Sequence, residues 1–333
     1  MNTTRDLPIR STKLEAENGL SVTLHNLGAT LQSIKVPTKN GPVEVLLGYP
    51  DTEDYEEDSF YLGSTVGRYA GRIADGKFEL GGKSYQLDRN DKDHGHCLHG
   101  GSGGFHSKYW LVDEDPNSNA VLYRTDSPDG DQGFPAKLKA TVRYSLVSSM
   151  VLQIDYFVEA ESDTIVNLTN HAYFNLNGDG SSIDNHEVWI NSEMYLPMGP
   201  DMLPTGDICN VKETVFDFRT KAVLADRMSQ MAPQLELAGG FDHFFLLNKA
   251  MKYPAIAASI ASPKTGIRLK FYSSRPGVQF YTGNSLTAPF DKHSGLCLEF
   301  QNAPNAPNVP GFPSPVQKAG HLWHRQLVME FES

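Results

Sequence analysis

The sequence has little cysteine, a deficit of positive charge and no long apolar segment, and each of these shortages excludes a class of protein. Cys97, Cys209 and Cys297 are the three cysteines in 333 residues, which is too few for a disulfide framework and fits a reducing compartment. Lysine and arginine number 29 against 40 acidic residues, for a net charge of −11, so a nucleic-acid partner is not expected. No run could span a bilayer, and Met1–Leu14 lacks the apolar stretch of a secretory signal. We therefore expect a cytoplasmic protein, monomeric or homodimeric, that binds neither nucleic acid nor membrane.

Helical periodicity is scarce, whereas short segments that alternate polar and apolar residues are frequent. In Met150–Val158 the apolar residues fall on one face of an extended strand, and Lys77–Leu87 has two alternating arms around Gly81-Gly82, a hairpin turn. Further strands are predicted at Ser21–His25, Ala29–Val36, Pro42–Leu47, Ala140–Leu146, Glu187–Ile190, His243–Leu247, Ile267–Tyr272, Val278–Thr282, Leu296–Phe300 and Gln326–Phe331. One short helix is predicted at Lys221–Met231.

This pattern predicts an all-β chain, a large and mostly antiparallel β-sandwich with few short helices, in which more than a dozen strands pack as two layers. No change in composition marks a linker, so residues 1–333 are expected to form a single domain. The proline- and asparagine-rich run Asn302–Pro315 cannot be a central strand, and we expect it to be a long surface loop.

The stretch Thr164–Gly178 combines a strand-like beginning with a polar, aromatic end. Its β-branched and apolar residues lead into His171 and Tyr173, with carboxamides on either side, before the turn signal Asn177-Gly178. Histidine exchanges protons near neutral pH, so a strand end that presents one is suited to acid–base chemistry. A half-buried strand in which His171 only makes a structural hydrogen bond explains this stretch equally well.

Two earlier stretches offer groups that could bind a ligand. Arg68 and Arg72 carry planar donors suited to sugar hydroxyls or anions, although a surface strand with two solvated arginines gives the same pattern. His94–His106 contains four histidines, which suggests a metal site, but no acidic residue follows the histidine pair closely and nothing fixes the ligand spacing. We therefore expect no metal. The glycines around His99 let the backbone approach a ligand, which makes His99 the simplest functional residue there.

Two later carboxylates stand in apolar surroundings. Asp242 follows a double glycine and lies between aromatic residues, where it could accept hydrogen bonds from sugar hydroxyls or simply cap a turn. Glu299 lies within the apolar strand Leu296–Phe300, and buried glutamates are rare unless paired or functional. Burial would raise its pKa toward the range of a general base; the alternative is that Glu299 faces solvent.

Taken together and in order, six motifs in this chain resemble the aldose 1-epimerase (galactose mutarotase) family. Each motif alone is weak, but six in the right order, spread from about Ser21 to Phe331, make a strong signal. The motifs are Gly67–Ile73, Leu98–Gly101, Asn170–Leu176, Phe241–His243, Pro276–Asn284 and Leu298–Gln301.

The resemblance implies a β-supersandwich with an open sugar cleft and an enzyme, an isomerase, that needs no cofactor. It implies that Glu299 is the general base and His171 the general acid, and that the substrate-binding residues are His99, Arg72, Asp242 and Gln279. Gly71 departs from the asparagine that the family usually has before its binding arginine, and the segment after Gln301 departs from the usual Pro-Asp form. These departures affect a hydroxyl contact and the shape of a loop.

An aldose changes anomer when its ring opens and closes again on the other face of the carbonyl. Ring opening removes the proton of the C1 hydroxyl and adds one to the ring oxygen, so one base and one acid, expected on opposite sides of the sugar, are enough. The sequence thus predicts an aldose 1-epimerase that acts on free galactose or glucose. Alternatives are a hexose-6-phosphate 1-epimerase, which calls for a cluster of cations, a non-catalytic carbohydrate-binding protein, and a histidine-ligated metal enzyme.

Overall fold

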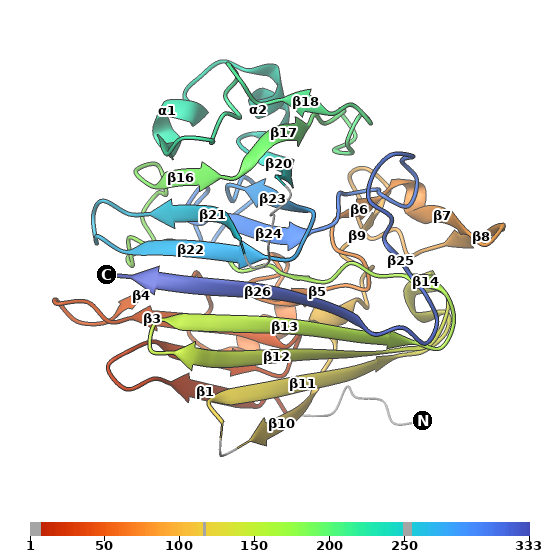
Figure 1. The fold of residues 1–333 in the computed structure, drawn as a ribbon, viewed down its shortest axis with the longest axis horizontal. Helices are drawn as coiled ribbons and strands as arrows, with labels where there is room; N and C mark the ends of the chain where they lie inside the picture. Colours follow the sequence, from red (N-terminus) through yellow and green to blue (C-terminus); the bar gives the residue numbers. More distant parts are fainter. Residues whose placement is uncertain (1–7, 116–117, 249–254) are drawn as a thin grey trace.

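In the computed structural model, which describes residues 8–115, 118–248 and 255–333, antiparallel sheets are the main regular structure (Figure 1). The largest sheet has nine strands, in the spatial order β10-β11-β12-β13-β26-β22-β21-β16-β19. Their bounds are β10 Leu111–Asp115, β11 Ala120–Ser127, β12 Leu138–Ser148, β13 Val151–Ala160, β16 Glu187–Ile190, β19 Ala222–Val223, β21 Ile256–Ala261, β22 Arg268–Ser273 and β26 Trp323–Glu332. All of its strand pairs are antiparallel.

Two smaller sheets pack against this one. One has the order β1-β2-β3-β4, and the other, which carries three of the six predicted site residues, has the order β18-β17-β20-β23-β24. Their bounds are β1 Ser11–Glu15, β2 Ser21–His25, β3 Thr30–Val36, β4 Val43–Glu44, β17 Ser192–Leu196, β18 Cys209–Asn210, β20 Asp242–Leu247, β23 Gly277–Tyr281 and β24 Cys297–Gln301.

The remaining elements are short. Four two-stranded pairs are β14 (Thr164–Ile165) with β25 (Val316–Gln317), β15 (Thr169–Asn170) with β5 (Thr65–Val66), β6 (Arg72–Ile73) with β9 (Cys97–Leu98), and β7 (Lys77–Leu80) with β8 (Lys83–Gln86). The helices are α1 (Leu224–Met228) and α2 (Pro233–Ala238), and 3₁₀ turns lie at Thr52–Glu57, Ala74–Gly76, Phe105–Ser107 and Asp131–Gly133. Within the described residues, no helix is long and apolar enough to cross a bilayer.

The core lies where the three sheets meet. One buried cluster joins Leu24 of β2, Val142 of β12, Phe271 of β22 and Phe280 of β23. In β12 and β13 the apolar residues alternate with polar ones, so one face of the large sheet enters this cluster. The predicted all-β class is therefore confirmed, since the alternation that indicated strands is what buries one face of each sheet.

Several local predictions need correction. The predicted strand at the start of Thr164–Gly178 is broken into β14 and β15, because its residues are buried on both sides and bond to separate segments. The helix predicted at Lys221–Met231 is shorter, α1. The segment Asn302–Pro315 is indeed a loop, but its first half, through Ala306, is buried rather than on the surface. There Ala303 and Ala306 pack with Phe244, so the loop forms part of a second small core.

Candidate active site

The five-stranded sheet presents a row of polar side chains on one face. Glu299 of β24 is the register partner of Gln279 of β23, and Tyr281 of β23 is the partner of Asp242 of β20. Register partners lie side by side on one face of an antiparallel sheet, so three adjacent strands bring together an acid, an amide and a second acid. On the opposite face, Val278 and Phe280 enter the core, which fixes the register and hence the direction of the polar row.

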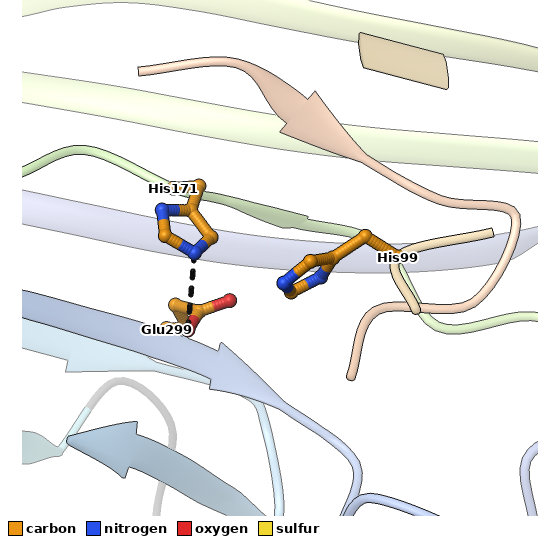
Figure 2. Close-up of side chains that lie close together, drawn as sticks. All are labelled: His99, His171 and Glu299. Atoms are coloured by element: carbon orange, nitrogen blue, oxygen red, sulfur yellow. Dashed lines mark ion pairs between the residues drawn. The ribbon is translucent and has the colours of Figure 1, made fainter. Parts of the chain in front are cut away.

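The facing wall comes from short segments far away in the sequence. Arg72 of β6 pairs with Leu98 of β9, and His99 follows directly. His171 follows β15, and its backbone N–H donates to Ser64 O at 2.9 Å while its carbonyl accepts from Gly63 N–H at 3.0 Å. This backbone pairing fixes the two segments that carry the imidazoles. Figure 2 shows both imidazole rings directed toward Glu299.

Between the two walls lies a cleft of about 200 Å³. All six predicted site residues line it: Arg72, His99, His171, Asp242, Gln279 and Glu299. Ser59 and Ser285, both exposed, are on its rim, so the cleft reaches the surface. The expectation that Glu299 faces solvent on an ordinary strand is excluded, because only 3% of Glu299 is exposed.

His171 and Glu299 are neighbours within the cleft (Figure 2). The Nε2 atom of His171 lies 3.7 Å from Oε1 of Glu299, and its Nδ1 atom lies 3.7 Å from the Sγ atom of Cys297. A separation of 3.7 Å leaves no room for a sugar ring between the two groups, so they are not on opposite sides of a substrate as expected. They can instead reach two adjacent oxygens along one edge of the ring.

Burial moves the pKa values of these two groups in opposite directions. Desolvation raises the pKa of Glu299 well above its ordinary value, and the nearby Asp242 carboxylate adds to this, while Arg72 opposes it. Desolvation also lowers the pKa of His171 to about 4, with a smaller contribution from His106. The buried pair therefore holds one proton between its two members over a wide range of pH.

His99 has a defined tautomer. The backbone N–H of Gly71 donates to its Nδ1 atom at 3.2 Å, so the ring proton is assigned to Nε2. Burial lowers the pKa of His99 well below its usual value, and His171 and Arg72 add to the effect, which keeps the imidazole neutral. Its ring centroid lies 5.1 Å from that of His171 in an edge-on arrangement. His99 thus offers a neutral N–H donor beside His171 and Glu299.

Arg72, Asp242 and Gln279 form a connected set of hydrogen-bonding groups. Arg72 Nε donates to Asp91 Oδ2 at 2.8 Å, and its Nη1 atom lies 4.0 Å from Asp242 Oδ2. Gln279 Nε2 donates to Asp242 Oδ1 at 2.7 Å, and its own Oε1 atom is buried without a partner among the described residues. Fixed donors and acceptors of this kind match the hydroxyls of a sugar.

A metal ion could also be held in this cleft. One nitrogen each of His99 and His171 and one oxygen of Glu299 all lie within 4.8 Å of one another, and two imidazoles with one carboxylate are a common ligand set. The pair that suggested a metal site in the sequence, His94 and His96, is not part of this group. His94 instead contacts Asp91, and His96 accepts from the N–H of Asp75.

Arg68, expected as a binding residue or a solvated surface residue, is neither. It is 2% exposed, and its guanidinium donates to the carbonyls of Ser127, Pro128, Pro135 and Ala136 and to the hydroxyl of Ser127. Arg68 is therefore a structural residue that ties together a neighbouring loop.

Two cleft residues escaped the sequence analysis as candidates. Gln301 lines the cleft, is 1% exposed, and neither polar atom of its amide has a partner among the described residues. Its position two residues after Glu299 was a usable signal, because alternate residues of a strand share a face. Tyr61 places its ring 4.7 Å from that of His99 and 5.8 Å from that of His171, and no pattern around it indicated this.

Gly71, the departure noted in the sequence, lies in the same place. Its φ of +81° is one that other residues rarely adopt, and a Cβ atom there would lie 3.3 Å from Nε2 of Gln301. Glycine therefore leaves room beside the Gln301 amide.

Comparisons with known proteins agree with this geometry. The sequence model described as aldose 1-epimerase matches residues 10–330. The chain is 38% identical to galactose mutarotase of Mus musculus, over 94% of this chain and 91% of that protein, and 36% identical to aldose 1-epimerase of Escherichia coli K12, over 92% and 90%. The structure is similar to that of an aldose epimerase homologue from C. elegans, with a TM-score of 0.89 at 28% identity over 98% of this chain and 99% of the other.

Proposed function

The chain belongs to the aldose 1-epimerase family and interconverts the anomers of a sugar, and we propose that Glu299 and His171 perform the two proton transfers. The observation that carries this proposal is the distance of 3.7 Å between Nε2 of His171 and Oε1 of Glu299 in an open cleft. The C1 hydroxyl and the ring oxygen of a pyranose are bonded to the same carbon. One neighbouring pair can therefore serve both atoms from the edge of the ring.

In the reaction, the shared proton of the pair passes from Glu299 to His171, which gives a carboxylate and an imidazolium. The carboxylate of Glu299 accepts the proton of the C1 hydroxyl while the imidazolium of His171 gives its proton to the ring oxygen. The bond between C1 and the ring oxygen breaks, and C1 becomes a carbonyl. After rotation about the C1–C2 bond, His171 takes back the proton of the C5 hydroxyl, which attacks C1, and Glu299 returns a proton to the carbonyl oxygen. Both residues end in their initial states, so no cofactor is consumed.

The remaining residues are proposed to position the sugar. His99 offers its Nε2 proton beside His171, which suits a hydrogen bond to the ring oxygen or the oxygen on C1. Arg72, Asp242 and Gln279 are assigned to the other hydroxyls because they line the same cleft and already share hydrogen bonds. Binding in a fixed orientation also lowers the barrier, since the proton donors need not search for their targets.

A free sugar suits this cleft better than a phosphorylated one. Among the described residues that line it, Arg72 supplies the positive charge, and Asp91 already pairs with Arg72. Asp242 adds an acidic group, which would repel a phosphate dianion when it is ionised. We therefore propose galactose or glucose as the substrate, in preference to a hexose 6-phosphate.

Polarimetry on freshly dissolved α-D-galactose and α-D-glucose tests these roles. Glu299→Gln and His171→Ala are expected to reduce kcat/KM by about 10²- to 10⁴-fold each, with an unchanged circular dichroism spectrum. Rates close to those of the parent enzyme in both variants would refute the assignment.

The compartment and the assembly also remain proposals. We propose the cytoplasm because the sparse, odd set of three cysteines fits a reducing environment, and the three are unpaired in the structure. A monomer or a homodimer is proposed for the assembly, and sedimentation equilibrium would distinguish the two.

A further inference from the structure

A second cavity, of about 720 Å³, lies beside strands β22 and β26, and none of its described lining residues is acidic. Residues on both strands and on the loop after β24 contribute to it. β22 and β26 are antiparallel neighbours, and Ser273 at the end of β22 is paired with Leu327. Continuing this register by two residues brings Arg275 opposite Arg325. Both arginines line the cavity, together with Ser273, Ser274 and Asn302.

The two guanidinium groups share one aromatic ring. The Cζ atom of Arg275 lies 5.1 Å from the centroid of the Trp323 ring, and that of Arg325 lies 5.0 Å from it. Trp323 and Arg325 are two residues apart on β26, so they project from the same face of the strand. Stacking on an indole holds both cations in place but neutralises neither of them.

Arg275 lacks the partners that a buried cation normally has. It is 7% exposed, it makes no ion pair with any described residue, and its Nε atom is buried without a hydrogen-bond partner. Arg325 likewise makes no ion pair within the described part of the chain. Burial and, to a smaller extent, the charge of Arg325 lower the pKa of Arg275 to about 9, while Tyr69 and Tyr156 oppose the change. A buried charge without compensation costs stability, and such a group calls for an explanation.

Arg68, a second buried arginine of the same chain, shows what a purely structural arginine looks like here. Its Nε atom, like that of Arg275, is buried without a partner among the described residues. Its Nη1 and Nη2 atoms, however, donate to five acceptors, and Asp131 and Asp129 lie close enough to raise its pKa against the effect of burial. Arg275, by contrast, uses one terminal nitrogen, Nη2, which donates to Oδ1 of Asn167. Its Nε atom is buried, and its Nη1 atom, which makes no hydrogen bond to a described residue, is left for a ligand in the cavity.

The anchor on Asn167 holds this arginine in position. Nδ2 of Asn167 donates to Ala70 O at 2.9 Å, and its Oδ1 atom also accepts from the backbone N–H of Asn302 at 2.8 Å. All of these groups are buried. A donor fixed in this way loses little conformational freedom when an anion binds.

We infer that this cavity is a binding site for a phosphate group, held by Arg275 and Arg325 and distinct from the catalytic cleft. Two guanidinium groups with no acidic neighbour match the double negative charge of a phosphate, and the planar arrangement of their donors suits its oxygens. The hydroxyl of Ser273 is a further donor in the lining. Leu246, Ile256 and Val316 supply apolar walls for the organic part of a phosphate monoester.

Isothermal titration calorimetry with inorganic phosphate, at constant ionic strength set with sodium chloride, tests this site. The parent protein is expected to bind phosphate, and Arg325→Gln and Arg275→Gln are each expected to raise Kd at least about tenfold, as the loss of a charge-assisted bond requires. Arg268→Gln is the matched control, because it removes one exposed positive charge from the same strand pair. Arg325 is only half-buried, so Arg325→Gln keeps the test valid if Arg275→Gln does not fold.

Three outcomes would overturn the inference: no binding of phosphate, equal Kd values in Arg325→Gln and Arg268→Gln, or loss of binding in Arg72→Gln, which would place the anion in the catalytic cleft.

A second titration with phenyl phosphate separates the two sources of the anion. Tighter binding than that of inorganic phosphate supports a monoester whose organic part uses the apolar walls, whereas equal binding supports free phosphate at the same site. The catalytic proposal is independent of all these results, since none of the arginine variants at this cavity alters a residue of the cleft.

Discussion

The Nε2 atom of His171 lies 3.7 Å from Oε1 of Glu299, although one residue follows the short strand β15 and the other lies in the middle of β24. Both side chains are almost completely buried, and both open onto the same cleft. The proposed acid–base unit rests on this contact, and the first two predictions follow from it.

The pair should behave as a unit when both members are removed. The double variant, which carries both Glu299→Gln and His171→Ala, is expected to have a mutarotation rate no lower than that of the slower single variant. Either change alone already ends the concerted proton transfer. Single-turnover polarimetry on α-D-galactose measures the three rates. If the two losses multiplied in the double variant, the residues would act independently and the proposed unit would be wrong.

The dependence of kcat/KM on pH should be a broad plateau. Adding a second proton to the pair inactivates it, and because burial lowers the pKa of His171 to about 4, the acid limb is expected near pH 4. Removing the shared proton inactivates it as well, and because burial raises the pKa of Glu299 well above its usual value, the alkaline limb is expected far above the ordinary range of a carboxyl group. Polarimetry across pH, with spontaneous mutarotation subtracted, tests this. An acid limb near pH 6.5, the value of an unperturbed histidine, would contradict it.

Metal removal should leave the activity unchanged, whereas excess zinc should inhibit. His99, His171 and Glu299 could together bind Zn²⁺, but a bound ion would occupy the atoms that the proposed reaction needs for proton transfer. Dialysis against EDTA is expected to preserve the rate, and Zn²⁺ is expected to compete with the sugar. His94→Ala serves as the control, because it removes an imidazole outside this group. A loss of activity in EDTA that Zn²⁺ restores would instead establish a metal enzyme.

Gln301→Ala should weaken sugar binding more than it slows the chemistry. Its amide has no described partner and lines the cleft beside Gly71, so we expect it to bond a hydroxyl of the substrate. Loss of one such bond is expected to raise KM by about tenfold, equivalent to about 1–1.5 kcal/mol, with a smaller change in kcat. Gln153→Ala, on β13 and outside the residues that line the cleft, is the control. An unchanged KM would show that Gln301 has only a structural role.

Arg68→Met should destabilise the fold without changing the chemistry directly. The substitution leaves four carbonyls and a hydroxyl without their buried donor, and we expect a loss of at least about 3 kcal/mol in the free energy of unfolding. Arg124→Ala removes a surface ion pair with Asp113 and is expected to cost no more than about 1 kcal/mol. Urea denaturation followed by fluorescence compares the two. Equal midpoints would mean that the bonds of Arg68 contribute little.

The sequence by itself determined the fold class and several strands. Alternation along Met150–Val158 and the glycine pair at Gly81-Gly82 predicted β13 and the turn between β7 and β8, because these signals are local and depend on only a few neighbouring residues. The six motifs also named six residues that the structure brings together in one cleft, but they did not single out Gln301 or Tyr61. The roles of the six residues and the single domain over residues 1–333 stay predictions.

Only the tertiary structure decided which groups meet and at what distance. Nothing local indicates that Arg68 is buried, that Asn302–Ala306 is covered, or that Arg275 and Arg325 share one indole, because each of these facts depends on segments that pair across the sheets. The same holds for the acid and the base, which the sequence placed on opposite sides of a sugar. Strand register and backbone bonds bring them side by side, since a sheet fixes the neighbours of a residue by pairing and not by position in the chain.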